Sequence, residues 1–354
     1  MTVRIERVKR FLRAAATLCN RDYPQYQEVR DTLSRATGLS PENVEWAFEN
    51  AFEVHPASWD LEALCRRTPE CGRAHVILSA NVFVGALRAI AIAIAAAPEV
   101  HVRASRREPQ MLEWLARVAP GQFELAGELT PSAGDHVWAY GSDETLRELR
   151  TKLAANTVVH GHGHGYGIVV LVEDELRRAT SLRAIADAIA SDTTAFDQRG
   201  CLSPRIVLVQ AELPMARELA QALAAALATR ENVIPRGQLS DDERAEIVRF
   251  RDTLCVAGEV FPAGCGCVSF ELQPLAWFLP PVGRVLHVKP TGNAIEAARA
   301  ESAQLTTIGV ADPTSDYAAR VRRAFPGARL AAIGHMQRPR LDGPVDLRHA
   351  PRLD

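Results

Sequence analysis

The sequence predicts an α/β protein with two lobes, mostly parallel sheets and a helical segment at the N-terminus. The chain has 354 residues, a length that exceeds the usual size of a domain with one hydrophobic core. With 47% hydrophobic residues it can form two cores. Short runs rich in Val and Ile recur between Ala-rich helical stretches, as expected for strands that alternate with helices. Before about residue 70 the hydrophobic residues follow a helical period instead.

Helices are predicted at three places in the first part of the chain. The N-terminal stretch MTVRIERVKRFLRAAATL disperses its basic residues along a helical period and lacks the apolar core of a secretory signal, which predicts an amphipathic helix. In SPENVEWAFENAF, Ser40 is the expected N-cap and Pro41 the first helical residue. The run AIAIAIAAA stops before Pro98 and is far shorter than a membrane span, so it predicts a buried helix.

Six apolar runs are predicted to be strands of sheets that are covered on both faces. They are HVILSA from His75, VHVRAS from Val100, HVWAY from His136, GIVVLV from Gly167, RIVLV from Arg205 and GRVLHV from Gly283.

Charge and cysteine content limit the function classes. Acidic and basic residues are interspersed and the formal net charge is -2, so no surface for a nucleic acid or an anionic membrane is expected, and a small-molecule partner is favoured. The seven cysteines are odd in number and scattered, and no export signal is seen, which indicates reduced thiols in a cytoplasmic protein.

The run HGHGHGYG alternates histidine with glycine before an apolar strand. His160, His162 and His164 have the spacing of metal ligands on one face of a strand, but the glycines disfavour a strand and no acidic residue lies in the run. The order is also the reverse of a dinucleotide fingerprint, in which the glycines follow a strand. The pattern favours a glycine loop that lines a cleft over a metal site.

Cys201 lies in FDQRGCLSPRIVLV, between a long helical stretch and a predicted strand. A thiol at such a junction is surrounded by backbone N–H groups, which stabilise both a thiolate and a developing oxyanion. An isolated cysteine is more often a buried structural residue, so the residues alone leave both interpretations open.

Four segments, in this order, carry a resemblance that covers most of the chain from about residue 73: ILSANVFVGALRAIAIAIAAAPEVHVRASRREP, AYGSDET, HGHGHGYGIVVLVEDEL and FDQRGCLSPRIVLV. Together they resemble the aldehyde dehydrogenase superfamily, and within it the acyl-CoA reductase family typified by the fatty-acid reductase of bacterial bioluminescence. The resemblance implies two Rossmann-like three-layer α/β/α lobes. We expect a helical segment and cofactor-binding domain over residues 1–165 and a catalytic domain over 166–354, with a C-terminal tail that returns to the first lobe.

The resemblance also implies the site residues. Cys201 falls on the catalytic nucleophile, and Asn81 on the asparagine whose amide completes the oxyanion hole with the backbone N–H of the nucleophile. The segment VHVRASRREP falls on the strand and turn that hold the adenosine ribose, and Gly141 and Ser142 fall on the pair beside the cofactor diphosphate.

Two departures from the family pattern point towards reduction with NADPH. Where aldehyde-oxidising members carry a glutamate general base, this chain has the run HGHGHGYG, so the carboxylate that activates water for deacylation is missing. In the ribose turn, Arg106 replaces the usual glutamate, and the cluster Arg103, Ser105, Arg106 and Arg107 suits a 2′-phosphate, which favours NADPH over NADH. A solvated basic turn is the alternative for this cluster.

A histidine of the run is a candidate proton donor or thiolate partner, and we name His162. Spacing does not rank His160, His162 and His164, and a structural lining is an equal alternative for each. Residues 213–281 are expected to contribute the acyl pocket, with PAGCGCVSF as a glycine-bearing turn and strand; Cys265 and Cys267 lack the second pair that a zinc site needs. The prolines near the C-terminus predict an irregular segment.

The expected activity is the NADPH-dependent reduction of an acyl thioester, from CoA or a carrier protein, to the aldehyde through an acyl-cysteine. No metal and no membrane span are expected, and a homodimer stays open because the antiparallel arm that pairs subunits in the superfamily is not found. Two alternatives remain: an acyltransferase that keeps the acyl-cysteine step without reduction, and a metal-dependent hydrolase that uses the histidine run.

Overall fold

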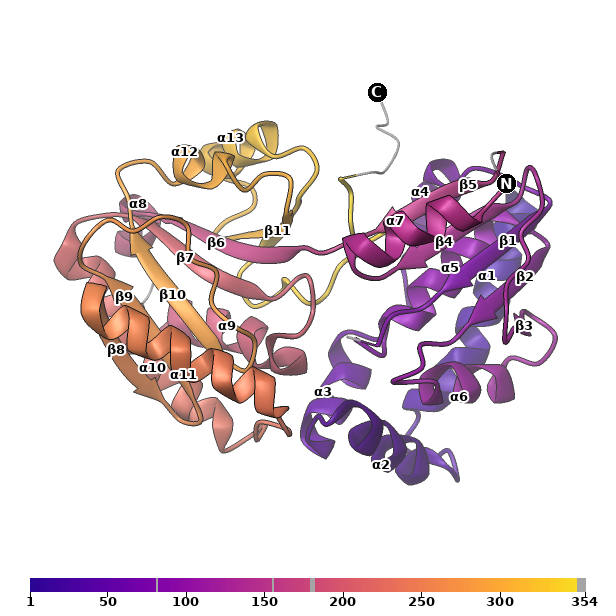
Figure 1. Cartoon of the computed structure of the whole chain (residues 1–354), viewed down its shortest axis with the longest axis horizontal. Coiled ribbons are helices and arrows are strands. Elements are labelled where there is room, and N and C mark those ends of the chain that lie inside the picture. The colour runs from indigo at the N-terminus through magenta and orange to yellow at the C-terminus, as the bar shows by residue number, and fades with distance from the viewer. Residues whose placement is uncertain (81, 155, 179–181, 349–354) are drawn as a thin grey trace. The chain divides into compact units, whose positions relative to one another are not determined.

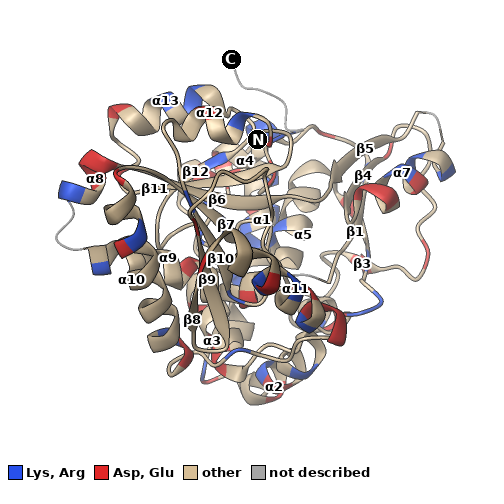
Figure 2. Ribbon diagram, turned by 60° about the vertical axis from the view of Figure 1, so that its left-hand side comes forward, with Lys and Arg blue, Asp and Glu red and all other residues tan. Residues whose placement is uncertain are grey.

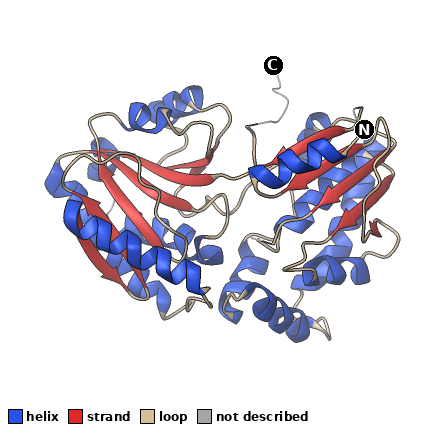
Figure 3. Cartoon of the chain, viewed as in Figure 1, coloured by secondary structure: helices blue, strands red, loops and turns tan. Residues whose placement is uncertain are grey.

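The computed structural model describes residues 1–80, 82–154, 156–178 and 182–348, and it divides the chain into two compact units (Figure 1). Unit 1 consists of Met1–Thr37, Val44–His164 and Arg340–Asp354, and unit 2 of Gly38–Asn43 and Gly165–Pro339. In each unit strands are flanked by helices, as Figure 3 shows. Among the described residues, no helix combines the length and the apolar character needed to cross a bilayer.

Unit 1 contains a parallel sheet in the order β3-β2-β1-β4-β5. β2 and β3 lie on one side of β1, and β4 and β5 lie on the other side. The direction in which successive strands are added therefore reverses between β1 and β4. Its strands are β1 (Arg73–Ile77), β2 (Glu99–Arg103), β3 (Glu124–Leu125), β4 (His136–Tyr140) and β5 (Val158–His162).

Helices cover this sheet, and the most apolar of them is α5, in which every residue after Gly85 is buried. Continuous apolar character is expected of a helix enclosed on all sides, and α5 packs against α1, β1 and β2. The helices that begin or lie in this part of the chain are α1 (Thr2–Ala15), the short η1 (Ala16–Cys19), α2 (Tyr26–Thr37), α3 (Pro41–Asn50), α4 (Ser58–Arg67), α5 (Gly85–Ala96), α6 (Gln110–Val118) and α7 (Asp143–Lys152).

Unit 2 contains a larger sheet in the order β12-β11-β6-β7-β10-β9-β8, in which only β8 pairs in the antiparallel sense among the described strands. The inner strand β6 carries no charged residue and is tan throughout in Figure 2. The strands are β6 (Tyr166–Val172), β7 (Pro204–Gln210), β8 (Gly258–Ala263), β9 (Gly266–Glu271), β10 (Val285–Pro290), β11 (Leu305–Val310) and β12 (Arg329–Ala332).

Both faces of this sheet are covered by helices. One core joins the sheet to α9 and α10, and a second joins the opposite face to α12 and α13. Charged side chains lie mainly on the helices, with acidic and basic residues intermixed (Figure 2). The helices are α8 (Glu173–Arg178), α9 (Leu182–Thr194), the short η2 (Ala195–Gln198), α10 (Leu213–Glu231), α11 (Asp241–Ala257), α12 (Ala294–Arg299) and α13 (Asp316–Ala324).

The elements predicted from hydrophobic patterning are confirmed. All six apolar runs form strands, as β1, β2, β4, β6, β7 and β10, and the run before Pro98 forms α5. Ser40 caps α3, since its Oγ accepts the backbone N–H of Asn43 at 3.2 Å. PAGCGCVSF forms the end of β8, a turn with Gly264 at φ +62°, and β9.

The histidine–glycine run differs from the predicted loop. Its first part is β5, which pairs in parallel with β4 from Val158 to His162, and only residues 163–165 form a connection before β6. The glycines are tolerated because α7 packs directly on this strand: a Cβ at Gly161 would lie 3.2 Å from a methyl of Leu146. Sequence spacing alone missed this, since tertiary packing overrides the low strand propensity of glycine.

The C-terminal segment from Arg340 has no helix or strand among its described residues and packs on unit 1. Arg67 on α4 pairs with Asp342 at 2.8 Å, and the buried Arg88 on α5 donates to the carbonyl of Gly343. The side chain of Arg340 in turn pairs with Asp60 on α4.

Candidate active site

Residues 195–203, which we call the cysteine turn, connect α9 to β7 and place Cys201 near the amino end of β7. Three successive residues before it, Phe196, Asp197 and Gln198, have φ of 53°, 49° and 68°. Left-handed backbone costs roughly 1–2 kcal/mol for each residue that carries a Cβ, so this turn persists only because its surroundings fix it.

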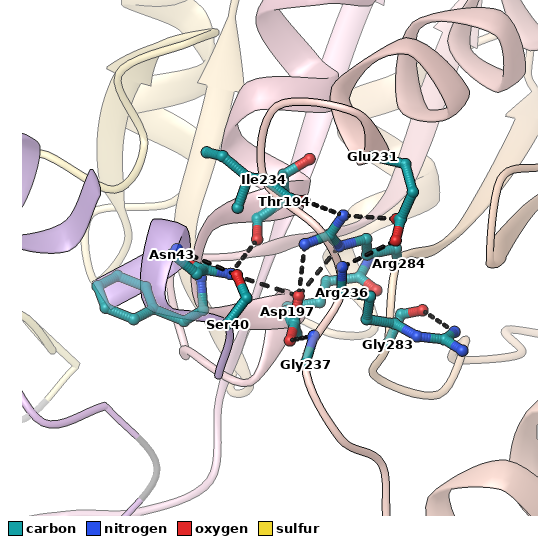
Figure 4. Close-up of polar contacts among 12 residues, drawn as sticks. Ser40, Asn43, Thr194, Asp197, Glu231, Ile234, Arg236, Gly237, Gly283 and Arg284 are labelled. Atoms are coloured by element: carbon teal, nitrogen blue, oxygen red, sulfur yellow. Dashed lines mark hydrogen bonds and ion pairs between the residues drawn. The ribbon is translucent and has the colours of Figure 1, made fainter. Parts of the chain in front are cut away.

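Asn43 fixes the first residue of the turn. Its side-chain oxygen accepts the N–H of Phe196 at 3.0 Å, and its amide donates to the carbonyl of Thr194 at 3.1 Å (Figure 4). Asn43 is fully buried, so it replaces the backbone partners that the end of α9 lacks.

Asp197 is fixed by a buried cation. Its Oδ1 accepts from Nε and Nη2 of Arg284 at 3.0 and 2.8 Å, and its Oδ2 accepts the N–H of Gly237 at 2.9 Å (Figure 4). The other end of the Arg284 guanidinium binds Glu231 at 2.8 Å and the carbonyl of Ile234 at 2.7 Å. The Asp197 side chain is 0% exposed and that of Arg284 1%, so both charges are compensated inside the protein.

Gln198 connects the turn to the neighbouring strands β7 and β10. Its amide donates to the carbonyls of Pro204 and Val285 at 2.8 and 2.7 Å, and its carbonyl accepts the N–H of Val285 at 2.8 Å. The turn is thereby bonded to the amino ends of both β7 and β10.

Gly167 at the start of β6 holds the other side of the turn. Its N–H donates to the carbonyl of Ser203 at 3.0 Å, and a Cβ at this position would lie 2.7 Å from the Leu202 oxygen and 2.9 Å from the Ser203 oxygen. The last glycine of HGHGHGYG therefore allows β6 to approach the backbone of the cysteine turn.

A further contact reaches Ser203 from the segment after β12. Gln337 donates to the Ser203 hydroxyl at 3.2 Å, while the buried Asp192 on α9 accepts the N–H groups of Gly334 and Met336 at 2.6 and 3.0 Å. Burial raises the pKa of Asp192 to about 7, against the effect of its backbone N–H donors.

Cys201 is a reduced, half-buried thiol in this turn. Among the other cysteines, Cys19, Cys71 and Cys265 are also half-buried, Cys65 and Cys267 are buried, and Cys255 is exposed on α11. Burial raises the pKa of Cys267 to about 11, as expected for an inert thiol inside apolar surroundings. The position of Cys201 in a strained turn that buried hydrogen bonds hold in place suits a nucleophile.

In unit 1 the candidate cofactor residues follow β2 and β4 at the carboxyl edge of the sheet. Arg103 ends β2 and Ser105, Arg106 and Arg107 follow it, while Gly141 and Ser142 follow β4. In open α/β sheets, ligands bind outside the carboxyl ends of the strands, at the point where the strand order reverses, which here lies between β1 and β4. Asn81, which follows β1, lies outside the described residues.

These residues have free donors of the kind that phosphate groups need. Within the described part of the chain, Arg103, Arg106 and Arg107 form no ion pair, and Ser105 accepts the backbone N–H of Arg107 at 3.2 Å. Ser142 caps α7 by accepting the N–H of Thr145 at 3.1 Å. Guanidinium groups without carboxylate partners, exposed at Arg106 and Arg107 and half-buried at Arg103, fit a phosphorylated ligand.

The three histidines of the run occupy different environments in unit 1. His160 stacks on Trp138 at 4.5 Å and contacts His136 at 3.2 Å, and burial lowers its pKa to about 4. His162 stacks on Tyr140 at 4.7 Å, with Nδ1 4.0 Å from the Asp346 carboxylate.

His164 is exposed, and its backbone N–H and carbonyl bind Asp143 and Arg348 respectively. Among the described residues no group of His, Cys, Asp or Glu side chains has the arrangement of a metal site. The stacking contacts favour a packing role for His160.

Replacing His160 with phenylalanine is expected to flatten the pH dependence of stability. The folded protein keeps the ring neutral down to about pH 4, whereas the unfolded chain binds a proton near pH 6.5, so stability is lost as the pH falls through this interval. Between pH 7 and pH 5 the wild type should lose about 1–2 kcal/mol more unfolding free energy than His160→Phe in urea titrations. Equal losses in the two proteins would contradict the neutral, buried state of His160.

Comparison with solved structures identifies the fold. An oxidoreductase from Marinobacter aquaeolei has a TM-score of 0.73 at 14% identity, covering 98% of this chain and 85% of the other. A Sinorhizobium meliloti 1021 protein described as a methylmalonate-semialdehyde dehydrogenase and solved with NAD has a TM-score of 0.69 at 14% identity, covering 97% and 78%. Lactaldehyde dehydrogenase from Escherichia coli has a TM-score of 0.65 at 14% identity, covering 92% and 78%. The fold is therefore that of the aldehyde dehydrogenase superfamily, as the sequence motifs predicted.

The family is identified by sequence. No curated protein matches the chain. The family model described as acyl-CoA reductase (LuxC) matches residues 115–349, which is more than half of the chain and includes Cys201 and the histidine–glycine run. The chain therefore belongs to the acyl-CoA reductase (LuxC) family and is an oxidoreductase that acts on aldehyde or acyl groups.

Proposed function

We propose that the protein reduces an acyl thioester to the aldehyde with NADPH, through an acyl-enzyme on Cys201. The observation that carries this proposal is a half-buried thiol in a strained turn that Asn43, Arg284 and Gln198 hold in place, in a chain whose 158–171 segment has no carboxylate to activate water. An acyl-enzyme that is not hydrolysed persists long enough to be reduced.

In the first step the Cys201 thiolate attacks the thioester carbonyl carbon. The oxyanion that forms accepts hydrogen bonds from backbone N–H of the cysteine turn and from the side-chain amide proposed for Asn81. The tetrahedral adduct collapses by expelling the CoA or carrier thiolate, which takes up a proton, and the acyl group remains on the Cys201 sulfur as a thioester.

In the second step the acyl carbon is reduced. The nicotinamide cofactor implied by the family supplies, in its reduced form, the hydride that adds to this carbon. The resulting thiohemiacetal on Cys201 loses the aldehyde and regenerates the thiol. The role of His162 as proton donor stays a prediction. Its ring stacks on Tyr140 and lies 4.0 Å from the Asp346 carboxylate, both in unit 1.

Residues at the carboxyl edge of the unit 1 sheet would hold the cofactor. Arg103, Arg106 and Arg107 would bind the 2′-phosphate that distinguishes NADPH, and Ser105 the ribose. Gly141 and Ser142 would lie beside the diphosphate, where the first turn of α7 offers backbone N–H groups.

Replacing Arg106 with glutamine is expected to weaken NADPH binding about ten- to hundredfold and to change NADH binding less than about twofold. A charge-assisted hydrogen bond to a phosphate contributes roughly 1.5–3 kcal/mol, and NADH has no phosphate at this position. Titration calorimetry with both cofactors measures the ratio. Arg117→Gln is the matched control, because Arg117 lies over the Trp114 ring of α6 outside the cluster. An equal loss for both cofactors would contradict a 2′-phosphate site.

Incubation of the protein with a panel of acyl-CoAs, followed by the absorbance of NADPH, tests the proposed function. Consumption of NADPH with release of one aldehyde and one free CoA thiol for each turnover is expected. Acyl-enzyme formation without NADPH oxidation would point to an acyltransferase instead, and thiol release that depends on an added metal ion would point to a hydrolase.

A further inference from the structure

We infer that Asp197 and Arg284 are positioning residues, which hold the turn of Cys201 in its reactive geometry. This inference rests on the proposed function, since it assumes that Cys201 is the nucleophile. The observation behind it is that the buried ion pair lies at the left-handed residues through which the chain must pass to reach Cys201.

The path from the ion pair to the cysteine is short and continuous. The N–H of Arg199 donates to the carbonyl of Phe196 at 3.0 Å, and that of Ser203 donates to the carbonyl of Gly200 at 3.0 Å. The first turn ends two residues before Cys201 and the second contains it, so the backbone has little freedom between Asp197 and β7. Displacement of Asp197 would therefore be transmitted to the backbone N–H groups beside the thiol.

Arg284 is itself held from several sides. Its own φ is +70°, and the N–H of the preceding Gly283 donates to the carbonyl of Asp197 at 3.0 Å. Glu231, which binds the far side of the guanidinium, also accepts the N–H of Arg236 at 2.8 Å (Figure 4). It accepts the thiol of Cys265 at 2.8 Å as well. These contacts fix the position of the Arg284 guanidinium, and a fixed guanidinium holds Asp197 and the backbone of the turn in one conformation.

Electrostatics and positioning predict opposite results when the Asp197 charge is removed. Loss of a negative charge near the turn would stabilise the thiolate and make Cys201 more reactive at a given pH. Loss of position would instead remove backbone N–H groups from the thiolate and the oxyanion and make Cys201 less reactive. Asp197→Asn separates the two, because the amide has nearly the same shape but cannot accept both from Arg284 and from the Gly237 N–H.

The test compares Asp197→Asn with Asp60→Asn in the full-length protein. Asp60 is a matched control because it is a buried aspartate with the same kind of pairing: its Oδ1 accepts from Nε and Nη2 of Arg340 at 2.6 and 2.5 Å, within unit 1. For Asp197→Asn we expect kcat with an acyl-CoA to fall about tenfold or more and KM to change less than about threefold, with Asp60→Asn close to wild type.

A chemical readout keeps this test separate from the reductase assay. Alkylation of Cys201 by iodoacetamide is followed by mass spectrometry from pH 6 to pH 10, with the exposed Cys255 as the internal reference. Slower alkylation of Cys201 in Asp197→Asn, with a pH profile moved to higher pH, is expected. Arg284→Lys should give the same pattern more weakly, and it decides the question if Asp197→Asn does not fold.

The outcomes distinguish the two proposals. If Cys201→Ala still reduces acyl-CoA, the proposed function fails whatever Asp197 does. If Cys201→Ala is inactive but Asp197→Asn keeps the wild-type kcat and alkylation profile, the positioning role alone is overturned. Equal losses of kcat in Asp197→Asn and Asp60→Asn, or faster alkylation in Asp197→Asn, also overturn it.

Discussion

Cys201→Ala should abolish aldehyde formation from acyl-CoA and leave NADPH affinity within about twofold of the wild type. Without the thiol no acyl-enzyme forms, and the loss of a nucleophile typically lowers kcat by about four to six orders of magnitude. The cofactor residues belong to unit 1 and Cys201 to unit 2, so the cofactor site keeps its own residues in this variant. Stopped assays for aldehyde, together with calorimetric titration of NADPH, measure both quantities.

The control for this prediction is Cys255→Ala, which removes an exposed thiol on α11 and should leave activity unchanged. Labelling with a radioactive acyl-CoA adds a direct readout: one acyl group should attach to each wild-type chain and none to Cys201→Ala. Aldehyde formation by Cys201→Ala, or acyl labelling of another cysteine in the wild type, would show that the nucleophile is assigned wrongly.

Much of the fold could be predicted because its strands are apolar runs between helices. All six predicted strands are inner strands of the two sheets, and their enclosed surroundings select for Val and Ile. Strand β5 could not be predicted, since His160 and Gly161 have low strand propensity and only pairing with β4 and packing under α7 make this segment a strand.

The site was predictable only in part. Cys201 and the residues after β2 and β4 lie in motifs that the resemblance carries, and their assignment to a site rests on that resemblance. The partners of the cysteine turn left no such signal. Asn43 lies 153 positions from Phe196, and Arg284 lies 87 positions from Asp197.

Left-handed backbone at three residues with side chains is also invisible in a sequence. Glycine normally marks such positions, and here Phe196, Asp197 and Gln198 occupy them because buried hydrogen bonds offset the strain. The sequence did contain one signal of this turn, namely the polar residues Asp197 and Gln198 shortly before Cys201, both of which are fully buried. Buried polar residues of this kind must be hydrogen-bonded, so their partners become evident only from the fold.

Gly167→Ala tests the approach of β6 to the cysteine turn from the opposite side. The new methyl group would lie 2.7 and 2.9 Å from the carbonyl oxygens of Leu202 and Ser203, and 2.9 Å from a methyl of Thr307, so backbone and not only side chains must move. Such overpacking costs roughly 1–3 kcal/mol of unfolding free energy, and a displacement near 1 Å at a nucleophile lowers kcat about a hundredfold.

The matched control is Gly161→Ala in the same histidine–glycine run. There the nearest atom is a methyl at the end of the Leu146 side chain, 3.2 Å away, which can shift without moving backbone. Urea unfolding and acyl-CoA reduction should therefore separate the two variants, with Gly161→Ala close to wild type in kcat. Comparable kcat in both variants would mean that β6 does not fix the turn, and the glycine would then serve only the packing of β6 against β11. The difference in kcat between the two variants is informative because Gly167 contacts the turn through its backbone alone. The substitution changes no charge and no hydrogen-bonding side chain near Cys201. A lower kcat in Gly167→Ala can therefore arise only from a change in the position of the turn.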